Sequence, residues 1–249
     1  MRLRAFIFLF FFLSTLSSAG ERNRVSLSLA PFLSGGLMGI MDFASSSLAY
    51  NGPLAGMGLC FSAQGKKVDC FADAAFSYGW LGNSYRRHPA PMRNQQVDFS
   101  IGGLIRIYGN NTITVKTGCS LGLTGNRHYN LSFNDRFSFA FDTKACMSAE
   151  LMLPRRFSVL VEERIPFVAF LWVFDNIKYD VPTILPDYSL KTVPGNDFRL
   201  VICRSLRSGN GLMLGLRHYC YSTGKALPDR FQIQLLEVGL AFRFGLTKS

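Results

Sequence analysis

The sequence predicts an all-β fold, an up-and-down antiparallel transmembrane β-barrel of about ten strands, with twelve strands as the alternative. Three observations support this prediction. Apolar and polar residues alternate with a period of two, the alternating segments are long enough to cross a bilayer at a tilt, and short and long connections follow one another along the chain. Strands of soluble proteins usually have about five or six residues, so the segment length favours a membrane barrel over a sandwich.

Residues 1–19 have the pattern of a secretory signal peptide. A basic head, Met1–Arg4, precedes an apolar run from Ala5 to Leu13, and small residues precede the expected cleavage after Ala19. The apolar run is much shorter than the ~20 residues of a membrane-spanning helix. We therefore expect residues 20–249 to form a single barrel domain that is exported to the cell outer membrane.

The composition excludes several other classes of protein. Of the 249 residues, 48% are hydrophobic and only 17% are charged, which excludes intrinsic disorder and a coiled coil. The longest later apolar run, Ile165–Phe174, contains Pro166 and is too short for a spanning helix, so a helical membrane protein is not expected. The formal net charge is +11, but nucleic acid is not an expected partner of an exported chain.

The alternation defines the individual strands. In residues 112–124, Ile113, Val115 and Leu121 lie on one face, whereas Lys116 and Ser120 lie on the other. The same pattern predicts strands over residues 22–33, 53–63, 67–79, 95–108, 112–124, 136–153, 157–165, 197–207, 212–222 and 231–246.

Connections of two kinds separate these strands. Tight turns are expected at 64–66, 109–111, 154–156 and 208–211, three of which contain Asn or Gly, residues that tolerate positive φ. Long loops are expected at 34–52, 80–94, 125–135, 166–196 and 223–230. In such a barrel the short turns and both termini face the periplasm, and the long loops are extracellular.

The last strand resembles the closing strand of Gram-negative outer-membrane β-barrel proteins. The segment Gly239–Phe244 alternates and ends on an aromatic residue, although five residues follow Phe244. The resemblance implies an integral outer-membrane location, and recognition of this strand by the outer-membrane assembly machinery. Outer-membrane lipids and lipopolysaccharide are the other expected partners.

The face opposite the apolar one supplies charges to the lumen. A barrel of about eight strands has room only for side chains, so we expect a salt-bridged plug, with a narrow polar pore as the alternative. The expected inward charges are Asp69, Asp73, Asp98, Asp142, Glu150, Glu162 and Glu237, and Arg106, Lys116, Lys144, Arg164, Arg199, Arg217 and Arg243.

The six cysteines are expected to be free and packed within strands. None is in CxxC spacing, and the chain has only three histidines, so we expect no metal and no cofactor. Alternation places one group toward lipid (Cys70, Cys119 and Cys220) and the other inward (Cys60, Cys146 and Cys203).

One catalytic hypothesis concerns His218 and Cys220, which share the lipid-facing side of a strand. The pair weakly resembles the His-x-Ser motif of outer-membrane lipid A deacylases, with His218 as base and Cys220 in place of the nucleophilic Ser. Tyr221 replaces the Asn that follows that Ser, Gln232 stands where an acid is expected, and the family has eight strands. We expect no enzymatic activity, with lipid A acyl hydrolysis as the alternative.

The segment 166–196 is the expected site of recognition because it is the longest connection. It is expected to form a lid or an apolar patch, or else an extended hairpin whose aromatic residues join an interfacial belt. A hairpin of 167–174 and 177–185 would give twelve strands. The candidate binding residues are Phe167, Phe170, Trp172 and Phe174, with Arg86 and Arg87 from the second long loop. The expected function is therefore a structural or surface-interaction barrel, with a pore or a lipid A hydrolase as alternatives.

Overall fold

The computed structural model describes residues 25–42, 49–83, 91–130, 135–176, 183–185, 195–206, 210–223 and 231–246. The expected signal segment, Arg86 and Arg87 lie outside these residues. The elements are β1 (Ser26–Asp42), β2 (Ala49–Gln64), β3 (Val68–Asn83), β4 (Met92–Gly109), β5 (Ile113–Asn130), β6 (Asp135–Leu153), the 3-10 turn η1 (Pro154–Arg156), β7 (Phe157–Asn176), β8 (Thr183–Leu185), β9 (Gly195–Ser205), β10 (Gly211–Thr223) and β11 (Phe231–Gly245). Within the described part of the chain, no helix is long and apolar enough to span a membrane.

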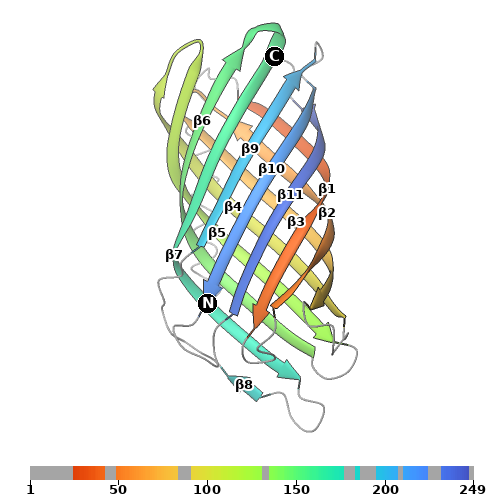
Figure 1. Cartoon of the computed structure of the whole chain (residues 1–249). Coiled ribbons are helices and arrows are strands. Elements are labelled where there is room, and N and C mark those ends of the chain that lie inside the picture. Colours follow the sequence, from red (N-terminus) through yellow and green to blue (C-terminus); the bar gives the residue numbers. More distant parts are fainter. Residues whose placement is uncertain are drawn as a thin grey trace.

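Ten of these strands form a closed antiparallel barrel, as the sequence predicts (Figure 1). Each strand pairs with the next along the chain, β7 pairs with β9, and β11 closes the circle on β1. The short β8 pairs only with Val173–Asp175 of β7 and adds no strand to the barrel wall. The expected twelve-strand alternative is therefore not adopted.

The short turns lie at one end of the barrel, which we call the short-turn end; the other is the long-connection end. In the turn between β4 and β5, the Asn110 side-chain oxygen accepts hydrogen bonds from the backbone N–H groups of Thr112 (2.8 Å) and Ile113 (2.7 Å). The turn between β6 and β7 requires positive φ at Arg155 and Arg156. The Leu246 N–H donates to the Leu27 carbonyl (2.9 Å), which places both ends of the described chain at the short-turn end.

Most of the strands are longer than the alternation predicts, and the long connections are correspondingly shorter. β1 runs to Asp42 and β2 begins at Ala49, so most of the expected loop 34–52 is strand. The described strands of the barrel wall have 11 to 20 residues, whereas about 9–11 suffice to cross a bilayer. The parts of β1 and β2 beyond that length need no lipid-facing apolar side, which explains why alternation did not reveal them.

Strand β7 does not end before Pro166, and this corrects the expected strand 157–165 and the expected loop 166–196. It continues to Asn176, paired with β6, and the register shifts between Thr143 and Lys144 opposite this proline. β9 pairs with β7 only as far as Arg164, so the missing N–H of Pro166 interrupts no ladder on that side.

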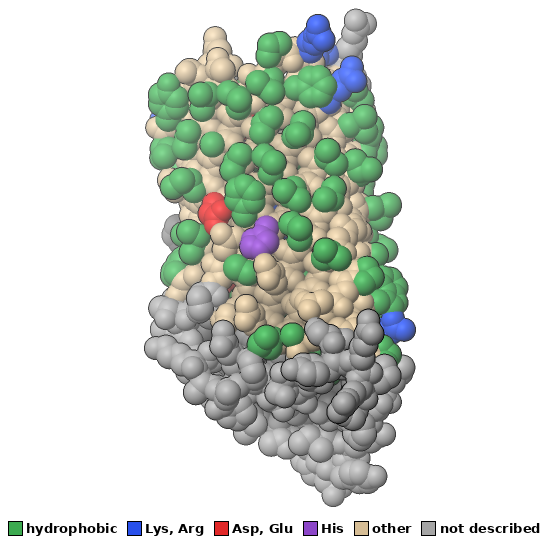
Figure 2. Space-filling model, viewed as in Figure 1, with side chains coloured by type: hydrophobic (Ala, Val, Ile, Leu, Met, Phe, Trp, Pro, Cys, Tyr) green, Lys and Arg blue, Asp and Glu red, His purple; other side chains and the backbone are tan. Residues whose placement is uncertain are grey.

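Apolar side chains cover the outer wall toward the short-turn end, as Figure 2 shows for one face of the molecule. Leu33 of β1 and Leu240 of β11 are paired in register, and each is 67% exposed. We call this surface the apolar belt. Its exposed large side chains include Leu33, Met57, Phe76, Val97, Phe99, Ile105, Leu123, Phe139, Met147, Ile202, Leu214, Val238 and Leu240.

Candidate functional site: an ion-pair layer across the lumen

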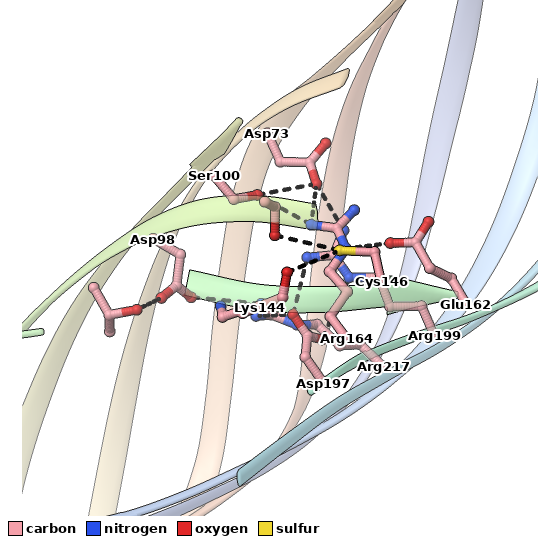
Figure 3. A network of polar contacts seen from close by, with 12 residues as sticks. Asp73, Asp98, Ser100, Lys144, Cys146, Glu162, Arg164, Asp197, Arg199 and Arg217 are labelled. Carbon is pink, nitrogen blue, oxygen red and sulfur yellow. Dashed lines mark hydrogen bonds and ion pairs between the residues drawn. The ribbon is translucent and has the colours of Figure 1, made fainter. Parts of the chain in front are cut away.

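Inward side chains from seven strands meet in a layer of opposite charges inside the barrel. Figure 3 shows part of this layer. Alternation brings them there, because every second residue of each strand faces the lumen. We call this group the cross-lumen layer. It consists of Asp73, Asp98, Asp142, Glu162, Asp197 and Glu237, with Lys144, Arg164, Arg199 and Arg217.

Two arginines of the layer reach across the lumen to the opposite wall. The Arg199 Nη1 of β9 lies 2.8 Å from the Asp73 Oδ2 of β3, and the Arg217 Nη1 of β10 lies 3.5 Å from the Asp98 Oδ2 of β4. In the ring of strands, β9 is opposite β3 and β10 is opposite β4. These side chains therefore occupy the middle of the barrel rather than lining its wall.

Asp197 joins these two arginines, and it was not among the expected lumen charges. Its Oδ1 accepts from Arg217 Nε (2.9 Å) and its Oδ2 from Arg199 Nη2 (3.1 Å). The residue is 1% exposed. A usable signal was present in the sequence, since Asp197 precedes Arg199 by two positions and so shares its face.

Arg164 of β7 completes the layer on the other side. Its Nη1 lies 2.9 Å from Asp73 Oδ2 and donates to the Ser100 hydroxyl at 3.0 Å, while its Nε contacts Glu162. The guanidinium also lies over the Phe71 ring, 4.2 Å from its centroid. Asp73 thus accepts from two arginines, which links β3, β7 and β9 through one carboxylate.

Lys144 and Asp142, both on β6, extend the layer toward β10. Their Nζ and Oδ2 are 3.4 Å apart, and the ammonium lies 5.9 Å from the Tyr219 ring centroid. Gly122 on the neighbouring β5 makes this arrangement possible. A Cβ there would lie 2.1 Å from Asp142 Oδ1, so a larger residue would displace the carboxylate.

A second, smaller ion-pair group lies nearer the short-turn end. Lys116 Nζ is 2.5 Å from Asp69 Oδ2 and 3.9 Å from Glu150 Oε2. Arg106 is paired with Lys116 in register but is exposed, next to the bulge between Arg106 and Tyr108. Arg243 donates to the Ser205 hydroxyl (2.9 Å) rather than to an acid.

A cavity of about 140 Å³ adjoins the cross-lumen layer. Much of its lining is apolar or small, and the charged lining residues all belong to the cross-lumen layer: Asp73, Asp98, Lys144, Asp197, Arg199, Arg217 and Glu237. The Glu237 carboxylate lies 3.6 Å from Arg217 Nη1 and accepts a 3.4 Å hydrogen bond from Ser34. Every charge that borders the cavity therefore already has a protein partner.

The His218 and Cys220 side chains lie on the outer wall, near the long-connection end of β10. His218 Nε2 is 3.2 Å from the Gln234 side-chain nitrogen, and Cys220 is opposite Asn196 and Gln234 in register. Within the described residues, no hydrogen bond joins His218 to Cys220 or to a carboxylate. Gln232, the expected counterpart of an acid, is opposite Ser222.

The outward Glu163 of β7 was not singled out in the sequence. Its carboxylate accepts a hydrogen bond from Asn196 (2.5 Å), two strands away from Cys220. Among the described contacts, none brings His218, Cys220 and Glu163 together as a base, a thiol and an acid.

The remaining candidates have simpler placements. Phe167 is exposed just after Pro166, and Phe170, Trp172 and Phe174 are part of β7 in its pairing with β6, with side chains outside the description. All six cysteines are free. In the ranges that the structure describes, no three His, Cys, Asp or Glu side chains are grouped as metal ligands.

Comparison with known proteins identifies the fold. No protein-family model and no curated protein matches the chain. The outer membrane protease OmpT from Escherichia coli is 7% identical with a TM-score of 0.57, over 91% of this chain and 98% of that one. The translocator domain of the autotransporter NalP from Neisseria meningitidis is 10% identical with a TM-score of 0.45, over 98% and 97%. The beta domain of the Bordetella autotransporter BrkA is 11% identical with a TM-score of 0.42, over 90% and 100%.

Such low identities show the fold alone. The chain has the closed barrel fold of bacterial outer-membrane β-barrel proteins.

Proposed function

We propose that this chain is an integral outer-membrane barrel of the structural and surface-interaction type, with a lumen closed to solutes. The pair of arginine bridges, Arg199 to Asp73 and Arg217 to Asp98, is the observation that carries the proposal. Both bridges cross the lumen between opposite walls, where a pore would need an open path. Acids and bases in such a layer satisfy one another, so an ion entering it would have to displace a protein partner.

The outer surface supports the membrane location. A belt of exposed apolar side chains surrounds the charged cross-lumen layer, which is the reverse of a soluble barrel and typical of outer-membrane barrels. Outer-membrane lipids and lipopolysaccharide are the proposed partners of this belt. Strand β11, which includes Gly239–Phe244 and closes the barrel between β10 and β1, is the proposed signal for the assembly machinery.

Surface interaction is assigned to the long-connection end. There the paired strands β6 and β7 continue past the point where β9 begins. This part of β7 contains Phe167, Phe170, Trp172 and Phe174. Lipid A acyl hydrolysis is not part of the proposal, because the described contact of His218 is with Gln234 and not with an acid.

Conductance in planar bilayers tests the closed lumen. We expect the native protein to insert without steady conductance. The double variant Asp73→Ala/Arg199→Ala removes one complete bridge, and we expect it to pass small ions measurably if it retains heat-modifiable gel mobility. Steady ohmic conductance of the native protein would overturn the proposal in favour of the narrow pore.

A further inference from the structure

The cavity beside the cross-lumen layer lies in a lumen that is filled on its long-connection side. Eleven buried residues of the described chain, from seven strands, form an apolar cluster there, which we call the apolar plug. Met38, Ile40 and Leu235 in this plug are each 1% exposed. Packing of this kind leaves no path for a solute, so the cavity is a blind pocket with its entrance toward the short-turn end. The members of the plug are Met38, Ile40, Tyr50, Leu54, Leu81, Met92, Ala140, Tyr219, Tyr221, Ile233 and Leu235.

The pocket has an apolar side, which lies toward this entrance. On β9, β10 and β11, its apolar lining residues are nearer to the short-turn end than the charged lining residues of the same strands. A ligand that reaches the charges from that end therefore leaves its outer part against apolar side chains. These apolar lining residues are partly exposed, and they are Phe32 of β1, Val201, Met213 and Ala241.

The charged side of the pocket has more acids than bases. Buried charges are tolerated when opposite charges compensate them, and here the compensation is incomplete. The cross-lumen layer as a whole has six acids and four bases. The lining of the pocket itself has four acids and three bases, namely Asp73, Asp98, Asp197 and Glu237 with Lys144, Arg199 and Arg217.

Glu237 is the lining carboxylate with the weakest described contacts. Its oxygens lie 3.6 Å from Arg217 Nη1 and 3.4 Å from the Ser34 hydroxyl, although the residue is only 7% exposed. The other three carboxylates each accept at least one bond of 2.9 Å or shorter, such as that from Thr124 to Asp98. Charge-assisted hydrogen bonds to a carboxylate are typically about 2.7–2.9 Å long, so Glu237 can still accept one.

The basic residue further along β11 does not compensate for this excess of acids. Arg243 lies six residues beyond Glu237, which is about 20 Å in an extended strand. Its guanidinium donates to the Ser205 hydroxyl near the short-turn end. At that separation, its repulsion of a cation beside Glu237 is largely screened.

We propose that this pocket binds a small organic cation that has one ammonium group and a short apolar body. The ammonium donates to Glu237 and supplies the missing positive charge, while the apolar body lies against Phe32, Val201 and Met213. The volume of about 140 Å³ is close to the ~150 Å³ of a cavity that holds benzene, so a single ring fits. This inference goes beyond the proposed function and requires neither a lipid partner nor conductance.

Isothermal titration of the purified protein in neutral detergent tests the site, with protein-free micelles as the blank. The probes are benzylamine, which is protonated at neutral pH, benzyl alcohol, which has the same ring and no charge, and ammonium chloride. We expect benzylamine to bind at least about tenfold more tightly than either of the other two, because only benzylamine satisfies both sides of the pocket.

Two variants examine the two sides of the pocket separately. Glu237→Gln keeps the size of the side chain and removes its charge, so benzylamine should bind about tenfold more weakly and benzyl alcohol as before. Gly215→Leu should abolish binding of both probes by filling the pocket. A Cβ at Gly215 would lie 3.9 Å from Val201 Cγ2 and 4.0 Å from the Gly239 carbonyl oxygen, so the new side chain has room to enter.

Gly35→Leu is the matched control for Gly215→Leu. Gly35 lies on the outer wall of β1 between Leu33 and Leu37, and a Cβ there would be 3.8 Å from the Leu54 carbonyl oxygen. We expect this variant to bind benzylamine as the native protein does. Heat-modifiable mobility verifies that each variant is folded, and Glu237→Gln tests the site by itself if Gly215→Leu does not fold.

Equal binding of benzylamine and benzyl alcohol, or of benzylamine and ammonium, would overturn the proposed class of ligand. Unchanged binding of benzylamine by folded Gly215→Leu or Glu237→Gln would show that the amine binds elsewhere and overturn the site. Absence of benzylamine binding to the native protein would overturn the whole proposal.

Discussion

At the scale of single residues, Asp197 connects the two arginine bridges of the cross-lumen layer, because its carboxylate accepts from both Arg199 and Arg217. Its partners, Arg199 and Arg217, are the residues that also reach the opposite wall. Removing the charge of Asp197 would leave both guanidiniums with fewer partners in a site that excludes most water. Loss of one partner from a buried ion pair typically costs about 3–5 kcal/mol.

We therefore expect Asp197→Asn to lower the free energy of unfolding by roughly that amount, measured by urea unfolding in lipid vesicles. Glu163→Gln is the control, since the Gln oxygen still accepts the hydrogen bond from Asn196 on the outer wall. Its effect should stay within about 1 kcal/mol. Equal midpoints for Asp197→Asn and the native protein would show that the cross-lumen layer contributes little stability.

At the scale of elements, β7 has two parts with different partners. Phe157–Arg164 pairs with both β6 and β9 and belongs to the barrel wall, whereas the part from Ile165 to Asn176 pairs with β6 and, at its end, with β8. Closure of the barrel depends on the first part. The second part extends a hairpin beyond the closed ring.

Replacement of 167–174 by a Gly/Ser linker should leave the barrel closed, because all pairing between β7 and β9 is retained. We expect native heat-modifiable mobility, with faster trypsin cleavage at the long-connection end. The same replacement over 157–164 should abolish the folded band. Loss of that band in the 167–174 variant would show that the hairpin is required for closure.

At the scale of the whole molecule, the apolar belt determines how the barrel sits in a bilayer. Leu240 lies in the belt, paired with Leu33 and 67% exposed, whereas Leu246 lies at the short-turn end and is 55% exposed. The two side chains have similar exposure but differ in their distance from the short-turn end, since Leu246 follows the last residue of β11. An arginine is most costly at the bilayer midplane, about 2–4 kcal/mol, and costs about 0–1 kcal/mol near the interface.

Leu240→Arg should therefore destabilise the protein in vesicles by about 2–4 kcal/mol, and Leu246→Arg by about 1 kcal/mol or less. Chemical unfolding of both variants in the same vesicles measures the difference. A larger cost for Leu246→Arg would place the bilayer elsewhere on the barrel, and no cost for either would mean that this surface does not face lipid.

The sequence by itself determined the local features of this protein. A period of two assigns each side chain to a face, and Asn and Gly mark tight turns, so strand number, turn positions and the inward placement of Asp98, Lys116, Asp142, Lys144 and Arg217 follow from neighbouring residues. Strand ends were less visible. The extended parts of β1 and β2 do not alternate regularly, and the extended part of β7 is apolar on both sides. Pro166 also interrupts the pattern where the structure accommodates it with a register shift.

Only the tertiary structure decided which side chains meet. Arg199 contacts Asp73 and Arg217 contacts Asp98, although 126 and 119 residues separate them in the chain. Such pairs depend on closure of β11 on β1, on the register of every strand between them and on the barrel diameter. Alternation specifies the side of a strand on which a residue lies, but closure specifies what lies opposite.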